Sequence, residues 1–346
     1  MIETIKYNSK IICISIAILI IVALGLSVFT GCRNTTQEFD STKDIDVISR
    51  EEGSGTKGAF SELFELIQVQ KADNINDANV ANTVKSSKII LQKDLTTKDA
   101  SVENSTNTIM TTVENDPYAI GYISMGSMND KVKPIEIDGI APTPENVKNG
   151  SYKISRPFII TYKSQISPLA EDFIGFILSK EGQKIANETY IEVDANADRY
   201  AGNMPSGSIV IGGSSSVSPL METLIDAYKS INPQAKLQLQ ITDSTTGIAK
   251  TSEGTYDIGM SSRDLKESEK GETPDANIGD HDNDNNNNNA LIETKIALDG
   301  ITLIVNKSNP IDNLSKDAVR DIYIGKFKTW NDVNVTIRNL SENKSE

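Results

Sequence analysis

The chain has 346 residues, with 34 Lys and Arg against 48 Asp and Glu, and a formal charge of −14. Affinity for a phosphate backbone comes from clustered Lys and Arg, so this acidic chain is not expected to bind nucleic acid. His281 is the single histidine, so Ser-His-Asp or Cys-His catalysis would have to use this residue. With one histidine and two cysteines, the chain is short of the usual ligands of a zinc site.

The N-terminus has the features of a secretory signal. Lys6 and Lys10 precede an apolar, uncharged run over residues 11–30, after which the chain turns polar at once. The alternative is an uncleaved membrane anchor, because the run is nearly long enough to span a bilayer.

The end of this run resembles a bacterial lipobox. Gly31 precedes Cys32, although Phe29 stands where leucine is usual. In a lipobox the cysteine is lipidated and becomes the new N-terminus. We therefore expect a signal peptide over residues 1–31, a lipid on Cys32 and a polar tether over residues 32–43. This arrangement predicts a lipoprotein on the outer face of the cytoplasmic membrane.

From residue 44 onward, short β-rich runs alternate with helical patterns. Strands are expected at residues 45–49, 119–124, 158–162, 208–211, 236–241, 257–262 and 297–306. Helices are expected at residues 58–68, 167–185, 217–230, 247–252 and 316–324. With 38% hydrophobic residues the chain can bury a core, and the alternation predicts an α/β fold with mostly parallel sheets.

Three segments depart from this pattern. Residues 196–207 contain glycines and a proline and are predicted to be a connector. Residues 273–289 are of low complexity and end in five asparagines, which indicates a solvated surface insertion. A calcium loop is the alternative, but the spaced glycine and terminal glutamate that it requires are missing. Residues 336–346 are a polar tail.

Three loops rich in Gly, Ser and Thr stand between a predicted strand and a helix start. They lie at residues 49–56, 213–217 and 243–247. Their hydroxyls could simply cap the helices. The free N–H groups and the dipole of a helix start can also bind an oxyanion, which glycines and hydroxyls would assist. None of the loops has the P-loop spacing, so nucleotide hydrolysis is not expected.

Two charged residues of the first loop fit an oxyanion site. Arg50 is the permanently charged, planar donor that holds tetrahedral oxyanions in bidentate fashion. Glu52 could accept a hydrogen bond from an anion that still carries a proton, as phosphate does at neutral pH and sulfate does not. A buried acceptor of this kind would reject the unprotonated anion. The alternative for Glu52 is a solvated carboxylate that the helix dipole favours.

Long parts of the sequence resemble the phosphate-binding proteins of bacterial ABC importers. The matching segments are residues 50–56, 211–220 and 257–263, with shorter ones at 119–122, 155–157, 297–300, 325–326 and 329–330. The resemblance implies a two-lobed, periplasmic-binding-protein-like (venus flytrap) fold of mixed sheets with flanking helices. It implies inorganic phosphate as ligand, ABC permease subunits in the membrane as partners, and no cofactor. Nothing in the sequence activates a nucleophile or positions a metal, so no enzymatic activity is expected.

Carried over position by position, the resemblance implies a set of phosphate contacts. They are Arg50, Glu52, Ser54, Gly55, Thr56, Ser215, Ser216, Ser244, Thr245 and Ser262. Some members have an aspartate at the position of Ser262, so discrimination by a carboxylate would depend on Glu52 alone.

The order of the two halves departs from the family. There, the segment like residues 209–333 comes first and the segment like residues 47–191 follows. The chain could be a circular permutant, with the old termini joined through the connector. It could instead be a piece of a tandem protein, holding the back of one copy and the front of another.

One folded unit would have two lobes. The first would comprise residues 44–157 and 298–335 and carry the Arg50 loop; the second would comprise residues 158–297. Phosphate would lie between them, and closure would be a hinge motion. The alternative function is a non-transport surface or signalling protein built on a rearranged or truncated form of this fold.

Overall fold

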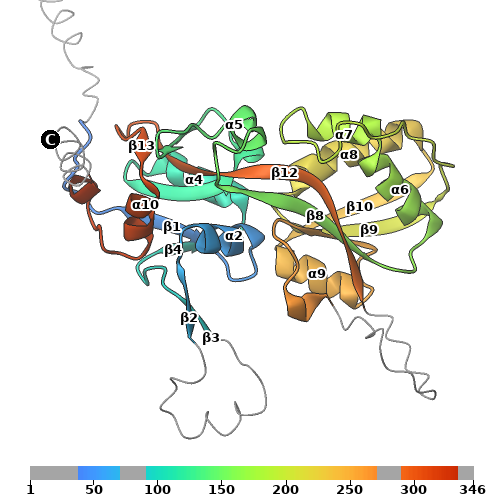
Figure 1. Ribbon diagram of the computed structural model, residues 1–346, viewed down its shortest axis with the longest axis horizontal. Coiled ribbons are helices and arrows are strands. Elements are labelled where there is room, and N and C mark those ends of the chain that lie inside the picture. The colour runs from blue at the N-terminus through green and yellow to red at the C-terminus, as the bar shows by residue number, and fades with distance from the viewer. Residues whose placement is uncertain (1–37, 71–90, 271–289, 334–346) are drawn as a thin grey trace, which may run out of the picture. The chain divides into compact units, whose positions relative to one another are not determined.

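A computed structural model describes residues 38–70, 91–270 and 290–333 (Figure 1). The predicted signal peptide, Cys32, the insertion at 273–289 and the polar tail lie outside these residues. Within the described part of the chain, no helix has both the length and the apolar character needed to cross a membrane.

A nine-stranded sheet forms the centre of the described residues, with its first strand starting at Asp46 and its last ending at Asn306. Its order is β10-β9-β11-β8-β12-β5-β1-β4, and β6 also pairs with β12. The strands are β1 (Asp46–Arg50), β4 (Ser101–Glu103), β5 (Ala119–Ser124), β6 (Val132–Pro134), β8 (Ser155–Lys163), β9 (Gly207–Ser214), β10 (Ala235–Thr242), β11 (Ile258–Ser261) and β12 (Leu291–Asn306). Two small sheets pair β2 (Ile67–Gln70) with β3 (Leu91–Asp94) and β7 (Glu136–Ile137) with β13 (Asn313–Leu314).

The sheet is mixed, and helices are interspersed with its strands along the described chain. β1 is parallel to β4 and β5, and β9 is parallel to β10 and β11, whereas β12 is antiparallel to β5, β6 and β8. The helices are α2 (Gly55–Leu63), α4 (Thr106–Asn115), α5 (Pro144–Lys148), α6 (Pro168–Leu178), α7 (Lys180–Ala186), α8 (Ser218–Ile231), α9 (Ser244–Ser252) and α10 (Lys316–Tyr323), with 3-10 turns η2 (Met125–Ser127) and η3 (Glu267–Glu269). The predicted α/β class is confirmed.

The long predicted helix over residues 167–185 is divided in the structure. Ser179 has extended backbone angles and separates α6 from α7. Its hydroxyl donates to the carbonyl of Phe176 and accepts from the amide of Gly182, so it closes the first helix and caps the second. The predicted helix at 58–68 likewise ends early, at Leu63, and is followed by Glu65 with a φ of 56°.

The two larger apolar clusters lie in different groups of elements, and β12 contributes to both. Phe158, Phe173 and Leu220 are buried between α6, α7, α8 and the strands β8 to β11. A second cluster, including Ile48 and Ile304, lies between α4 and the strands β1, β5 and β12. β8 and β12 extend across both groups of elements (Figure 1). The lobe boundaries that the sequence predicts fall within these two strands and stay a prediction.

A buried ion pair lies where β8 and β12 pass between the two groups. Arg156 and Asp299 face each other in the ladder, and the guanidinium Nη2 lies 3.2 Å from Oδ2 of the carboxylate. The amide of Gly126 donates to the other oxygen at 3.4 Å. Burial raises the pKa of Asp299 to about 6, against the opposing effect of the Arg156 charge.

Two carboxylates hold the predicted connector. Glu181 accepts a hydrogen bond from the amide of Tyr200 at 2.8 Å. Asp172 on α6 accepts hydrogen bonds from the hydroxyls of Tyr200 and Tyr228 and from the amide of Asn203. In the group of elements that contains β1, the amide of Asn331 donates to the carbonyl of Ser41 at 2.7 Å. Hydrogen bonds therefore fix the connector to α6 and join residues near the two ends of the described chain.

Candidate functional site

Several polar loops meet at one edge of the sheet. β1 ends at Arg50, β9 at Ser214, β10 at Thr242 and β11 at Ser261. The strands β9, β10 and β11 are parallel, so the loops that follow them share one edge. β1 runs in the opposite direction within the sheet, and hydrogen bonds from Arg50 and Thr56 to Ser215 and Ser216 join its loop to theirs. The structure thus brings together the three loops that the sequence singled out.

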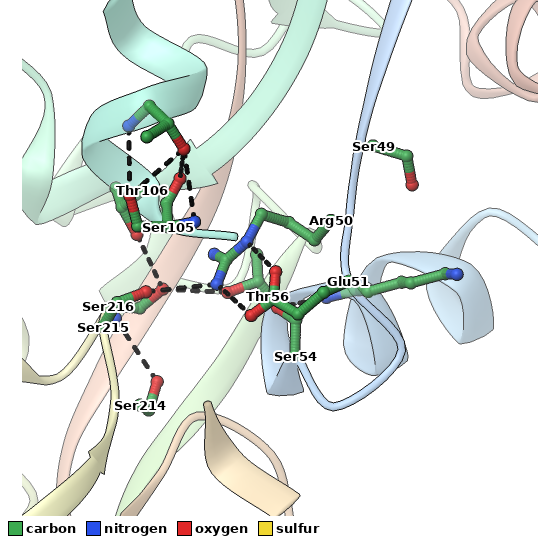
Figure 2. A network of polar contacts seen from close by, with 12 residues as sticks. Ser49, Arg50, Glu51, Ser54, Thr56, Ser105, Thr106, Ser214, Ser215 and Ser216 are labelled. Atoms are coloured by element: carbon green, nitrogen blue, oxygen red, sulfur yellow. Dashed lines mark hydrogen bonds and ion pairs between the residues drawn. The ribbon is translucent and has the colours of Figure 1, made fainter. Parts of the chain in front are cut away.

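The guanidinium of Arg50 lies among these loops, and the residue is 2% exposed (Figure 2). Its Nε and Nη2 donate to the two carboxylate oxygens of Glu51, each at 2.8 Å. Nη2 also donates to the hydroxyl of Ser215 at 3.1 Å. Nη1 is buried and has no hydrogen-bond partner within the described residues. The guanidinium therefore retains a donor for another group.

Ser216 links the first loop to the helix start of α4. Its hydroxyl lies 2.9 Å from the hydroxyl of Thr56 and 3.2 Å from that of Thr106 (Figure 2). Ser54 caps α2 by accepting a hydrogen bond from the amide of Lys57. All of these hydroxyl-bearing residues are buried.

The remaining hydroxyls form a second short chain. The hydroxyl of Ser262 accepts from that of Ser214 at 3.0 Å and lies 3.4 Å from that of Ser244. Gly55 approaches the same pair, since a Cβ atom there would lie 2.4 Å from Oγ of Ser244 and 2.7 Å from Oγ of Ser262. We call Arg50, Thr56, Thr106, Ser214, Ser215, Ser216, Ser244 and Ser262 the hydroxyl cluster.

Four helices begin at this cluster. Thr56, Thr106, Ser218 and Ser244 lie in the first turns of α2, α4, α8 and α9. The free N–H groups of a helix start carry a partial positive charge, and four of them at one place favour an anion. Together with one guanidinium and buried hydroxyls, they form an environment rich in hydrogen-bond donors.

Four predicted contacts are not members of this cluster: Ser54 and Gly55 adjoin it, whereas Glu52 and Thr245 have other partners. The Glu52 side chain is 85% exposed, and its carboxylate pairs with the ammonium of Lys57. The hydroxyl of Thr245 accepts a hydrogen bond from Arg263, and its amide donates to the carbonyl of Gly53. The structure does not bring Glu52 to the other predicted residues, and it gives Thr245 a role in fixing the loop.

The sequence had not singled out four participants. Thr106 is the first residue of α4, after the strand β4 and the N-cap Ser105. This order of strand, hydroxyl residue and helix start is the same as in the three predicted loops. Ser214 stands directly before the two predicted serines. Glu51 neighbours Arg50, and the hydroxyl of Tyr122 accepts from the Arg50 amide at 3.2 Å. Burial raises the pKa of Tyr122, so this hydroxyl stays neutral.

The chain resembles proteins of known name along most of its length. Residues 34–181 and 199–345 match the family model of the PBP superfamily domain. Phosphate-binding protein PstS 2 of Streptococcus agalactiae serotype V is 40% identical over 312 residues, which is 90% of this chain and 94% of that protein. The PstS 2 protein of Streptococcus pneumoniae serotype 4 is 36% identical over 320 residues, 91% and 98% of the two chains.

A solved structure agrees with these matches. A crystal structure described as a phosphate ABC transporter, phosphate-binding protein from Streptococcus pneumoniae TIGR4 superposes with a TM-score of 0.59 at 36% identity. The superposition covers 84% of this chain and 99% of the chain in the crystal structure. The sequence alignments run along nearly the whole of the two PstS 2 proteins, so these relatives carry their halves in the same order as this chain.

Proposed function

The chain belongs to the PBP superfamily and, within it, to the PstS phosphate-binding proteins, and on this premise we propose that it binds inorganic phosphate and delivers it to an ABC-type phosphate importer. The observation that carries the proposal is the buried guanidinium of Arg50, which keeps a free donor among hydroxyls drawn from distant parts of the chain.

The cluster suits a small, tetrahedral oxyanion. Arg50 supplies Nη1, and each hydroxyl can turn its hydrogen away from its neighbour and toward an anion. The helix starts add backbone N–H groups without adding net charge. A chain of formal charge −14 does not attract anions through its overall field, so recognition depends on these local donors.

We propose nine of the ten predicted residues as the phosphate site. Arg50, Gly55, Thr56, Ser215, Ser216, Ser244 and Ser262 would contact the ligand, while Ser54 and Thr245 would fix the loops that present them. The predicted role of Glu52 as acceptor of the phosphate proton stays a prediction.

The setting of the protein is also a proposal. We propose that residues 1–31 are removed, that Cys32 carries a lipid, and that the protein works on the outer face of the cytoplasmic membrane. We further propose that the chain forms one unit of two lobes, which is supported by hydrogen bonds between Arg50 and Ser215 and between Thr56 and Ser216.

Calorimetric titration with phosphate, arsenate and sulfate tests the proposed function. We expect one phosphate per chain, comparable binding of arsenate because its shape and protonation are similar, and much weaker binding of sulfate. A folded protein that takes up no phosphate would contradict the proposal.

The close approach of Gly55 gives a second test. In Gly55→Ala, the added methyl group would overlap with Ser244 and Ser262 and push the first loop away from them. Overpacking typically costs about 1–3 kcal/mol, so we expect phosphate affinity to fall roughly 5- to 100-fold.

Gly58→Ala is the matched control for this change. It lies in the same helix, and its Cβ would be 3.4 Å from the nearest atom, Cδ of Arg263. We expect its affinity to stay within about threefold of the wild type. Equal effects of the two substitutions would show that the approach of Gly55 is unimportant for binding.

A further inference from the structure

We propose that a latch between the first and the third predicted loop controls how fast the bound anion is released. The latch is the hydrogen bond from the backbone amide of Thr245 to the carbonyl of Gly53, at 3.1 Å. The inference rests on the proposed phosphate binding and on the proposed two lobes. It makes Gly53, Asp243 and Arg263 positioning residues for the retention of the ligand.

The latch joins loops from distant strands of the sheet. Gly53 follows β1, whereas Asp243 and Thr245 follow β10 and begin α9. In the order of the sheet, β8 and β12 lie between β10 and β1, so the two loops meet across the strands that connect the proposed lobes. Under the proposed boundaries the bond joins the first lobe to the second. A hinge motion that separates the lobes must therefore break it.

The latch uses groups that the ligand does not need. The amide of Thr245 is one of the first N–H groups of α9, which have no partner inside the helix. The carbonyl of Gly53 accepts from it, so this amide is directed to the first loop and not to an anion. The latch can therefore form while the hydroxyl cluster turns its donors to a ligand, and it stabilises the closed arrangement without competing for the anion.

The latch depends on the absence of a side chain at Gly53. A Cβ atom there would lie 2.2 Å from Oδ1 and 2.5 Å from Cγ of Asp243. This carboxylate is held in place, because it caps α9 by accepting from the amide of Thr246 at 2.8 Å and from its hydroxyl at 2.6 Å. An added methyl group would push the first loop away and open the contact between Thr245 and Gly53.

Arg263 holds the other partner of the latch. Its Nη2 donates to the hydroxyl of Thr245 at 3.1 Å, and Nη1 and Nη2 donate to the two carboxylate oxygens of Glu269, each at 2.7 Å. Nη1 also donates to the carbonyl of Asp264 at 3.0 Å, and the Arg263 side chain is only 10% exposed. The guanidinium is thus fixed within the second proposed lobe and keeps Thr245 where its amide reaches Gly53.

A bond of this kind acts mainly on release. The anion would lie between the lobes, so it leaves only after they part, and the latch adds to the free energy that parting requires. Variants of one binding site differ mostly in their dissociation rates, and one hydrogen bond makes a modest contribution. We therefore expect loss of the latch to speed release several-fold and to change the association rate little.

The test compares full-length Gly53→Ala with the wild type, using radiolabelled phosphate and rapid filtration. Loaded protein is mixed with excess unlabelled phosphate to measure release, and free protein is mixed with labelled phosphate to measure association. We expect Gly53→Ala to release phosphate at least about fivefold faster. Its association rate should stay within about threefold of the wild type. A release rate equal to that of the wild type, or a change confined to association, overturns the inference.

Gly175→Ala is the matched control. It adds the same methyl group in α6, where no atom would lie within 4 Å of it, and it should release phosphate at the wild-type rate. An equal acceleration in Gly175→Ala contradicts the inference.

Thr245→Val tests the part of Arg263 separately. It keeps the shape and the amide but removes the hydroxyl that Arg263 holds, so its release rate should lie between those of the wild type and Gly53→Ala. A wild-type release rate in this variant overturns the positioning role of Arg263.

Hydrogen exchange without phosphate separates an opened latch from a loosened fold. In Gly53→Ala the segment that contains the Thr245 amide should exchange faster than in the wild type, while the strands of the sheet keep their protection. Faster exchange along the whole chain would overturn the inference. If the folded wild type binds no phosphate, the proposed function fails and the inference fails with it. If it binds phosphate and Gly53→Ala releases it at the wild-type rate, only the inference fails.

Discussion

Phosphate affinity should fall by at least about 100-fold when Arg50 is replaced by alanine, which corresponds to about 2.7 kcal/mol. Arg50 is the one charged donor of the hydroxyl cluster as defined here, and it is 2% exposed. Truncation of one partner in a buried, charged hydrogen bond typically costs about 2–5 kcal/mol. The hydroxyls and helix starts would remain, but they carry no full positive charge.

Calorimetry on the folded variant measures this loss, and Lys57→Gln serves as its control. Lys57 lies seven residues further along the chain and has its own ion pairs with Glu52 and Asp94. We expect its affinity for phosphate to stay within about threefold of the wild type. Near-normal affinity in Arg50→Ala would place the anion elsewhere in the molecule.

The second large effect concerns stability and the buried pair between β8 and β12. Arg156→Met keeps the bulk of the side chain but leaves the carboxylate of Asp299 buried without its countercharge. Loss of one partner from a buried ion pair typically costs about 3–5 kcal/mol. We expect the free energy of unfolding at pH 7.5, measured by urea denaturation, to fall by this amount.

The loss should shrink as the pH falls. The pKa of Asp299 in the fold, about 6, stands above its ordinary value of 3.8, so the folded protein takes up this proton before the unfolded chain does. Without Arg156 the pKa of Asp299 in the fold rises further. Proton uptake by Asp299 therefore begins to stabilise the folded variant at a higher pH than it does in the wild type. Between pH 7.5 and 5 we expect the difference from the wild type to narrow by roughly 1–2 kcal/mol.

A double variant provides the control for this interpretation. Arg156→Met combined with Asp299→Asn removes both charges and should recover part of the stability lost at pH 7.5, because no unpaired charge remains. Its difference from the wild type should not narrow at low pH as that of the single variant does. If the stability loss of the single variant Arg156→Met grew as the pH falls, the electrostatic explanation would be contradicted.

Local patterns in the sequence indicated much of the site. Each of the three loops follows a β-rich run and precedes a helical pattern, and this order alone places their hydroxyls at helix starts. That these loops meet was implied by the resemblance to the phosphate-binding proteins and not by the strand pattern, because β1 runs opposite to β9, β10 and β11 within the sheet. The resemblance also supplied Ser262, which lies in none of the three loops, and it grouped this residue with Arg50, Thr56, Ser215, Ser216 and Ser244.

Other features depend on contacts between distant segments. Which of two neighbouring glutamates turns toward Arg50 is decided by the direction of the chain at the end of β1 and by the position of Lys57. The division of the predicted long helix depends on the hydroxyl of Ser179, which no periodic pattern reveals. The pairing of Arg156 with Asp299 is a matter of strand register across 143 residues.

The contact between Ser41 and Asn331 bears on how this chain relates to the importer family that its sequence resembles. The pairing of strands in a sheet fixes which strands are neighbours, but it does not fix their order along the polypeptide chain. Here the two segments meet at a 2.7 Å hydrogen bond, while the opposite junction is a connector held by Asp172. A gene opened within that connector and closed by a short bridge from Asn331 to Ser41 would encode the other order with every strand pairing intact.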